Sequence, residues 1–148
     1  MRILRLQKEP FELSAEIASL TAGRDVGALV TFTGLCRHEG RLLGLEIEHY
    51  PDMAAAEIAR VVEEACGRWP LDGVLVIHRY GLIRPGEPIV LVATTSRHRG
   101  EAFAAAEFLM DYLKTRAPFW KREHTRAGLG EWVGAREEDA QAAEKWGS

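Results

Sequence analysis

The sequence predicts an α+β protein, because its expected strands occur in adjacent pairs as well as in alternation with helices. Apolar and polar residues alternate in 41–50, as in a half-buried strand, whereas apolar residues recur at helical spacing in 51–68. The expected strands 73–80 and 88–96 are joined by a short turn sequence, as in a hairpin. The length of 148 residues predicts one domain covering residues 1–148.

The first half of the chain contains three expected strands and two expected helices. Ser14 is a suitable N-cap for the first helix, and Gly23 would end it. Pro51 and Asp52 favour the start of the second helix. The core-facing stripe of that helix is Ile58, Val62, Ala65 and Trp69. The expected strands are 2–7, 26–36 and 41–50, and the expected helices are 14–21 and 51–68.

The second half begins with the hairpin and continues with a long helix. Pro85 and Gly86 are well placed for the turn within Arg84-Pro85-Gly86-Glu87. The core-facing stripe of the long helix is Phe103, Ala106, Met110 and Leu113. The expected elements are strands 73–80 and 88–96, a helix 100–115, a hairpin of 119–125 and 131–135 around Gly128 and Gly130, and a polar helix 137–146.

The composition is that of an ordinary globular protein, with 47% hydrophobic and 28% charged residues. The net charge of −3 argues against a general nucleic-acid binder, which is usually basic. No apolar run approaches the roughly 20 residues that span a bilayer, so we expect no membrane insertion and a cytoplasmic location. Cys36 and Cys66 fit no metal-ligand spacing, and we expect both to be reduced and one or both to be packing residues.

The segment MDYLKTRAPFWKRE, residues 110–123, carries the strongest functional signal. Pro118 cannot continue the helix that precedes it. Lys114 and Lys121 lie on either side of this break, and Phe119 and Trp120 between them are suited to anchor the exit strand in a core. Two ammonium groups held near each other form an anion site and lower each other's pKa. The pattern therefore favours an enzyme that acts on a phosphate or a carboxylate.

Other cations are expected at the ends of regular elements. Arg37 follows a strand, and the triplet at 97–99 precedes the helix 100–115. A helix start offers free N–H groups and a positive dipole to an anion. Arg99 and Lys114 would be about 20 Å apart along this helix. A symmetric dimer could bring one subunit's helix start to the other subunit's lysines.

Each of these residues also has a structural interpretation. Lys114 could only complement the helix dipole, and Lys121 could be a solvated edge charge. The cationic triplet could be a solvated helix cap. His78 and Arg79 lie in a strongly apolar strand, where we interpret them as structural residues that hydrogen-bond locally. The residues alone support an anion site without deciding its ligand.

Six segments, in the same order, resemble the large, catalytic subunit of molybdopterin synthase, the MoaE family. They cover most of residues 27–136. The segments are GALVTFTGLCR (27–37), EHYPDMA (48–54), VIHRYG (76–81), TSRHRGEAF (95–103), MDYLKTRAPFWKRE (110–123) and EWVGAR (131–136). The resemblance implies an α/β hammerhead fold with a mixed, largely antiparallel sheet packed by helices.

The resemblance also implies a function and a set of site residues. Lys114 and Lys121 match the family's two active-site lysines. Positions that match family pocket residues are Arg37, His98, Arg99, Arg136 and Phe32. The implied reaction converts cyclic pyranopterin monophosphate to the dithiolene molybdopterin, with no metal and no organic cofactor. The implied sulfur donor is a small ubiquitin-like subunit with a C-terminal Gly-Gly thiocarboxylate, in a heterotetramer built on a homodimer of the large subunit.

Two other functions remain open from the sequence. The same cations could serve a hydrolase or transferase that acts on another phosphorylated small molecule. Alternatively, the chain could be a non-catalytic module that binds a protein C-terminus along a sheet edge. Sulfur transfer that requires the small subunit would exclude the first, and loss of activity with retained partner binding in lysine variants would exclude the second.

Overall fold

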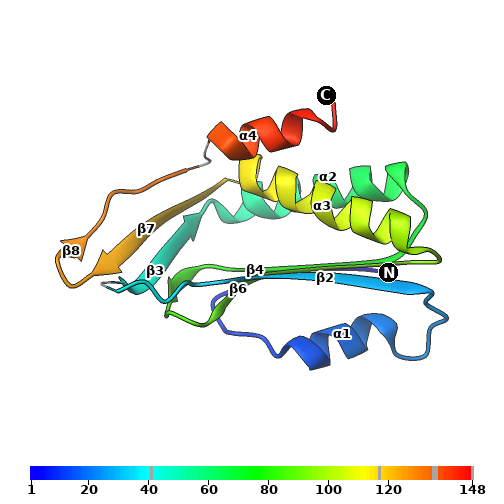
Figure 1. The fold of residues 1–148 in the computed structure, drawn as a ribbon, viewed down its shortest axis with the longest axis horizontal. Coiled ribbons are helices and arrows are strands. Elements are labelled where there is room, and N and C mark those ends of the chain that lie inside the picture. The colour runs from blue at the N-terminus through cyan, green and yellow to red at the C-terminus, as the bar shows by residue number, and fades with distance from the viewer. Residues whose placement is uncertain (41, 117, 135–136, 148) are drawn as a thin grey trace.

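The computed structural model describes residues 1–40, 42–116, 118–134 and 137–147 (Figure 1). These residues form helices and two four-stranded sheets, which confirms the predicted α+β class. The predicted mixed, largely antiparallel pairing is also confirmed, because β1 runs parallel to β4 and the other strand pairs are antiparallel. No helix in this described part is both long and apolar enough to cross a bilayer.

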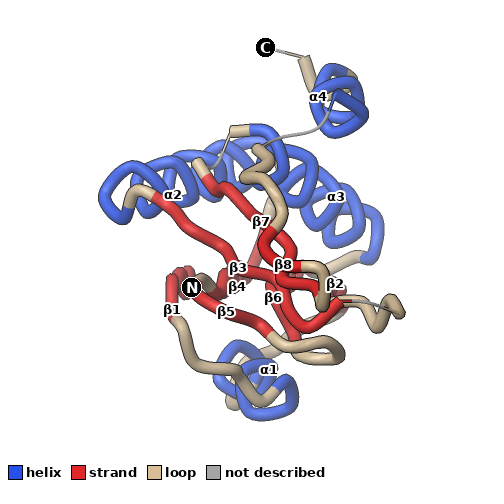
Figure 2. Tube along the Cα trace, turned by 90° about the vertical axis from the view of Figure 1, so that its left-hand side faces the viewer, coloured by secondary structure: helices blue, strands red, loops and turns tan. Residues whose placement is uncertain are grey.

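The larger sheet lies between two layers of helices. Its central strands β4 and β6 pair in the predicted hairpin, and β2 occupies one edge. Helices α2 and α3 cover one face and α1 covers the other, as Figure 2 shows. The sheet order is β1 (Arg2–Gln7), β4 (Leu71–Arg79), β6 (Pro88–Ser96) and β2 (Ala28–Leu35), and the helices are α1 (Leu13–Thr21), α2 (Pro51–Arg68) and α3 (Arg99–Thr115).

The smaller sheet projects from one end of the larger one, where Figure 1 shows β3, β7 and β8. The described strands therefore form two separate sheets. Gly81 has φ +83°, a conformation that suits glycine, and it separates β4 from a short strand that the sequence did not predict. That strand pairs with β3 instead. The sheet order is β5 (Gly81–Ile83), β3 (Leu42–His49), β7 (Phe119–Thr125) and β8 (Gly128–Leu129).

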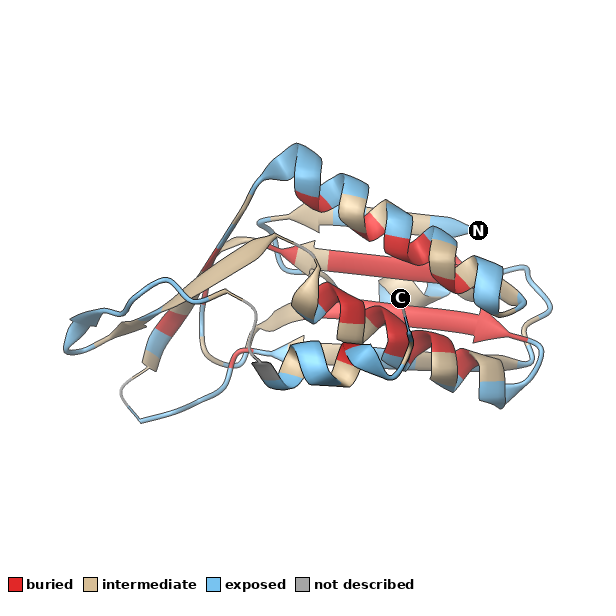
Figure 3. Ribbon diagram, turned by 90° about the horizontal axis from the view of Figure 1, so that it is seen from above, coloured by how far each residue is buried: buried red, intermediate tan, exposed pale blue. Residues whose placement is uncertain are grey.

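The core follows the alternation of side chains along β4. Val74 and Val76 face α2 and α3, whereas Leu75 and Ile77 face the α1 side, where Leu20 is fully buried. Figure 3 shows this burial along the central strands and along the helix faces above them. Because β4 is covered on both faces, its central residues form a continuous apolar run.

Two predicted details of the helices are wrong. Glu12, not Ser14, caps α1, and its carboxylate accepts a hydrogen bond from Ala15 N at 2.9 Å. Phe103 is 61% exposed, because the first turns of α3 bury Ala102, Ala105 and Ala106 instead. Small alanines allow the helix to approach the sheet closely, so the largest apolar residue of this turn lies outside the core.

The hairpin after β7 closes earlier than predicted. Its returning strand is the two-residue β8, whereas the predicted strand 131–135 contributes only a bridge between Val133 and Lys121 in the described part. Helix α4 (Glu137–Glu144) follows and packs on α3. Trp146 then lies edge-on to Phe108 and donates its indole N–H to Asp111 at 2.6 Å.

Arg79 should be a major source of stability. Its side chain is 4% exposed and donates to the Lys8 carbonyl, the Pro88 carbonyl and the Glu87 carboxylate. Arg79→Ala should lower the free energy of unfolding by about 3 kcal/mol, because buried acceptors lose their donors. Urea unfolding measures this change. Arg60→Ala, which removes an exposed pair with Glu57, is the control and should stay near the wild-type value; equal losses would contradict the assignment.

Candidate active site

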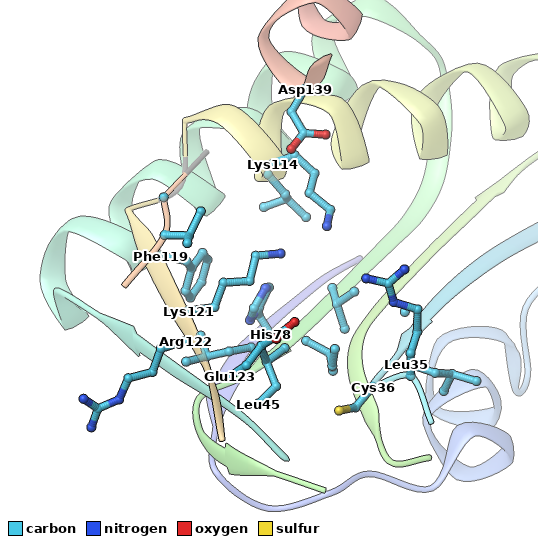
Figure 4. Close-up of a pocket in the computed structure, with 18 of the residues that line it drawn as sticks. Leu35, Cys36, Leu45, His78, Lys114, Phe119, Lys121, Arg122, Glu123 and Asp139 are labelled. Carbon is cyan, nitrogen blue, oxygen red and sulfur yellow. The ribbon is translucent and has the colours of Figure 1, made fainter. Parts of the chain in front are cut away.

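A cavity of about 800 Å³ opens where the two sheets meet the end of α3. It is lined by the end of β2, by β3, β4, β6 and β7, by the last turn of α3, and by the first turn of α4. Figure 4 shows the side chains of Lys114, Lys121 and His78 directed into this space, with Cys36 on another side of it. Apolar residues line much of its wall, and Lys121 is half-buried among them, whereas Lys114 is exposed.

The end of α3 brings Lys114 to the cavity. The helix ends at Thr115, and Arg116 caps it through a backbone hydrogen bond to the Tyr112 carbonyl at 2.7 Å. Pro118 follows, as the sequence predicted, and β7 starts at Phe119. The ammonium group of Lys114 therefore projects from the helix end into the cavity.

The backbone of Lys121 is held on both sides. Lys121 pairs with Ile47 of β3 on one side. On the other side it exchanges two hydrogen bonds with Val133, at 3.0 and 2.7 Å. A strand fixed in this way sets the direction of the Cα–Cβ bond of Lys121, and the side chain lines the cavity.

A polar cluster on the opposite face of β7 reinforces this bridge. One carboxylate oxygen of Glu46 accepts from His124 at 2.8 Å and from Arg122 at 2.9 Å, and these two bonds lower the pKa of Glu46. The Arg122 guanidinium also lies 4.4 Å from the centre of the Trp132 ring. The cluster ties the segment that contains Val133 to β7 and β3.

Phe119 forms the floor of the cavity together with His78. The two rings stack with centroids 3.9 Å apart and an interplanar angle of 13°. The centre of the His49 ring lies 5.8 Å from the centre of the Phe119 ring. The interpretation of Phe119 as a core anchor therefore holds, and the same ring also lines the cavity.

His78 hydrogen-bonds locally to the Arg79 carbonyl, as predicted, and it also lines the cavity, which the sequence did not indicate. Arg79 does act structurally, but His78 points the other way from the strand and lines the cavity. Burial, with smaller contributions from the nearby Lys114 and Lys121 ammonium groups, lowers the pKa of His78 to about 4. Its imidazole is therefore neutral at physiological pH. No signal in the sequence indicated that His78 lines this cavity, because the residue lies in an apolar strand far from Lys114 and Lys121 along the chain.

This histidine should make stability depend on pH. Its folded pKa of about 4 lies below the ordinary 6.5, so the unfolded chain binds more protons between these values. The contribution of neutral His78 to the free energy of unfolding is complete above pH 6.5. It is lost as the pH falls to about 4, and the loss is on the order of 3 kcal/mol. His78→Phe should flatten this part of the curve of unfolding free energy against pH. His49→Phe isolates the share of His49, whose pKa burial also lowers; an unchanged slope in His78→Phe would contradict the prediction.

The end of β2 supplies two predicted residues, Phe32 and Arg37. The register of β2 against β6 shifts between Gly34 and Leu35. Any residue larger than glycine at position 34 would place its Cβ 2.8 Å from the Val90 side chain, which is too close. Cys36 then bonds through its backbone to the turn at 86–87. Arg37 projects from this anchored segment at the exposed mouth and pairs with Glu39 at 3.1 Å.

Cys36 also lines the cavity but is a poor nucleophile. Burial raises the pKa of its thiol, so the protonated form dominates at neutral pH. Its sulfur lies 3.8 Å from the Ile83 carbonyl and packs beside Ile47. Both cysteines are free, as expected. The described cavity therefore offers cations rather than its own reactive sulfur.

His98 and Arg99 lie at the start of α3, about 20 Å from Lys114 along the helix. They are not among the described residues that line the cavity. Arg136 lies outside the described residues. One subunit thus brings together Lys114, Lys121, Arg37 and Phe32, and it leaves the helix-start cations at a distance.

The arrangement suits an organic anion. The lysines can bind the negative charge of such a ligand, and Phe119 and the neighbouring apolar residues can contact its ring. His78 adds a polar side chain that is neutral at physiological pH. The carboxylates of Glu123 and Asp139 also line the cavity, and Asp139 points toward Lys114 in Figure 4. Acidic neighbours limit the net charge, so charge alone does not define the ligand.

Comparisons with known proteins agree on one family. The family model described as MoaE protein matches residues 6–116. The molybdopterin synthase catalytic subunit of Mesorhizobium japonicum is 62% identical over 148 residues, which covers 98% of this chain and 93% of the relative. The molybdopterin biosynthesis MoaE protein from Burkholderia ambifaria superposes with a TM-score of 0.87 at 45% identity and covers 100% of this chain and 99% of that one. Molybdopterin synthase from Staphylococcus aureus superposes with a TM-score of 0.78 at 30% identity and covers 87% and 95%. This chain, with its lysines placed across a helix-to-strand break, belongs to the MoaE protein family.

Proposed function

We propose that this chain is the catalytic subunit of a molybdopterin synthase. It transfers sulfur from the thiocarboxylated Gly-Gly terminus of a small ubiquitin-like subunit to cyclic pyranopterin monophosphate, and the product is the dithiolene molybdopterin. The observation that carries this proposal is the convergence of Lys114 and Lys121 on one cavity, on a chain 62% identical to a molybdopterin synthase catalytic subunit.

The electrostatics of the cavity support this chemistry. A thiocarboxylate and a cyclic phosphate are both anions, and bringing them together in water is unfavourable. Fixed cations in a partly apolar cavity offset that repulsion without reorganising during the reaction. A Gly-Gly tail is slim enough to enter beside the end of α3. The donor brings activated sulfur, so the proposed reaction requires no metal or organic cofactor of its own.

We assign separate roles to the two lysines. Lys114 pairs with the incoming tail and stabilises charge on its acyl carbon. Lys121 holds the pyranopterin or transfers a proton as oxygen is lost. Arg37 and Phe32 contact the substrate near the mouth of the cavity, where both lie.

A second copy of the chain completes the phosphate site in this proposal. His98, Arg99 and Arg136 hold the phosphate in the partner subunit's cavity, which accounts for the distance between the start of α3 and Lys114. The edge position of β2 supports a dimer, because Leu29 and Phe32 are exposed there and Phe103 is exposed on the neighbouring α3. The whole chain then acts as one cytoplasmic catalytic domain, with one small subunit docked at each end of the dimer.

Product analysis tests the function directly. The chain is incubated with the thiocarboxylated small subunit and cyclic pyranopterin monophosphate, and mass spectrometry follows the product. We expect a gain of two sulfurs that depends on the thiocarboxylate. Conversion with an unmodified carboxylate terminus would instead support another phosphate-ester transferase or hydrolase. Stable carrier binding without conversion would support a docking module.

Mixing two inactive variants tests the shared site. Sedimentation should show a dimer without the small subunit. If Arg99 serves the opposite cavity, dimers formed from Arg99→Ala and Lys121→Ala chains each regain one intact site. Statistical exchange should then restore about a quarter of the wild-type activity, because about half of the dimers are mixed. A fully active monomer, or no recovery on mixing, would contradict the cross-subunit arrangement.

A further inference from the structure

The hydrogen atom on His78 can be placed from its surroundings. Nδ1 lies 2.9 Å from the Arg79 carbonyl oxygen. A carbonyl oxygen only accepts hydrogen bonds, so Nδ1 must carry the hydrogen and donate it. In a neutral ring the second nitrogen, Nε2, is then unprotonated and presents a lone pair.

Nε2 lies at the tip of a side chain that reaches into the cavity. The ring is held against Phe119 by the close stack and at its base by the bond to Arg79. Among the described residues, the side-chain hydrogen bond of His78 is made by Nδ1 and not by Nε2. Figure 4 shows the ring beside the ends of Lys114 and Lys121.

Protonation of this nitrogen is unfavourable. The groups that face the ring from neighbouring elements are Lys114, Lys121 and His49, and each opposes a positive charge there. Burial acts in the same direction and is the larger effect. The cavity therefore contains a fixed acceptor among cationic donors.

We propose that His78 is a specificity-determining residue whose Nε2 accepts a hydrogen bond from an N–H or O–H group on the ring system of the substrate. The inference rests on the proposed function, and it assigns the recognition of the ring rather than of the phosphate. Lysine ammonium groups attract any small anion, whether or not it carries a donor. A fixed acceptor selects ligands whose donor group meets it, since an unmatched buried polar group is unfavourable.

Two variants separate recognition from structural support. His78→Asn keeps an amide N–H near the position of Nδ1 for the Arg79 carbonyl and removes the acceptor at the ring tip. His78→Gln places an amide oxygen near the tip. The probes are cyclic pyranopterin monophosphate, which carries ring N–H donors, and sulfate, which carries none. Dissociation constants are measured by calorimetry on the full chain without the small subunit, and thermal unfolding monitors the fold.

We expect His78→Asn to weaken pyranopterin binding at least about tenfold, with sulfate binding changed less than twofold, because one neutral hydrogen bond is lost. His78→Gln should recover part of the loss. Parallel losses for both probes would overturn the proposal and leave His78 as a support for Phe119. Unchanged pyranopterin binding in His78→Asn would also overturn it.

A measurement on the wild-type chain keeps the test independent of variant folding. The ¹⁵N resonance of His78 Nε2 should shift toward the hydrogen-bonded range when the pyranopterin is added and should stay in place with sulfate. An unmoved resonance at saturating pyranopterin would refute the contact. Failure of sulfur transfer in the wild-type assay would instead refute the proposed function, because these binding measurements do not depend on turnover.

Discussion

Lys121→Ala should reduce molybdopterin formation at least about 100-fold, which corresponds to about 2.7 kcal/mol of transition-state stabilisation. The expectation follows from how firmly the residue is positioned. Its backbone is bonded to β3 on one side and to Val133 on the other, and its side chain lines the cavity. A replacement group that diffuses into the site cannot reproduce such placement.

The rate is measured as product formed per minute with saturating thiocarboxylated carrier. Lys8→Ala is the matched control, because Lys8 is an exposed lysine outside the cavity lining. Lys121→Arg keeps a charge and separates charge from proton transfer, since arginine does not give up its proton. Turnover near the wild-type rate in Lys121→Ala, with Lys8→Ala equally active, would remove Lys121 from the mechanism.

The regular elements with strong local signals were predicted closely. Strands β6 and β7 begin and end where the sequence placed them, because their apolar patterns are bounded by turn residues and by Pro118. The partition into two sheets could not be predicted. It depends on the three-residue β5 and on the turn at Gly81, and an element of this length has too few residues to show a period.

The candidate site was predicted unevenly, for physical reasons. Lys114 and Lys121 are close in sequence, and the break at Pro118 restricts where they lie, so their convergence on one cavity was expected. His78 comes from a distant strand. A histidine in an apolar strand gives no sign of which neighbour it meets, and only the packing of Phe119 shows that its face of β4 opens to the cavity. The catalytic roles themselves remain predictions.

Arg79 and His78 show how adjacent residues divide two tasks. Successive side chains of a strand point to opposite faces. Arg79 is buried among backbone carbonyls on one side, and His78 lines the cavity on the other. The carbonyl of Arg79 also fixes the His78 ring. The structural residue Arg79 and the neutral hydrogen-bond acceptor His78 are therefore adjacent in β4.

Lys114→Ala should lose activity through poor handling of the carrier's tail. Lys114 ends α3, and its ammonium projects into the cavity where an extended Gly-Gly terminus can enter. The terminal anion is attracted to the exposed Lys114 ammonium group there. We expect a loss of at least about 100-fold, because the acyl carbon would lack its nearest stabilising charge. Single-turnover measurements over a range of carrier concentrations should show a slow chemical step, with carrier binding weakened less.

An adduct formed without substrate can locate the tail. When the carrier terminus is activated as an acyl ester and no pyranopterin is present, a deprotonated Lys114 amine can attack its carbonyl. A C–N bond forms, the bond to the leaving group breaks with its electron pair, and the nitrogen loses a proton, which leaves an isopeptide bond. Digestion and peptide sequencing should map this bond to Lys114. Adducts mainly at Lys8 or Lys145, both outside the described cavity lining, with none at Lys114, would contradict the placement of the tail at the end of α3.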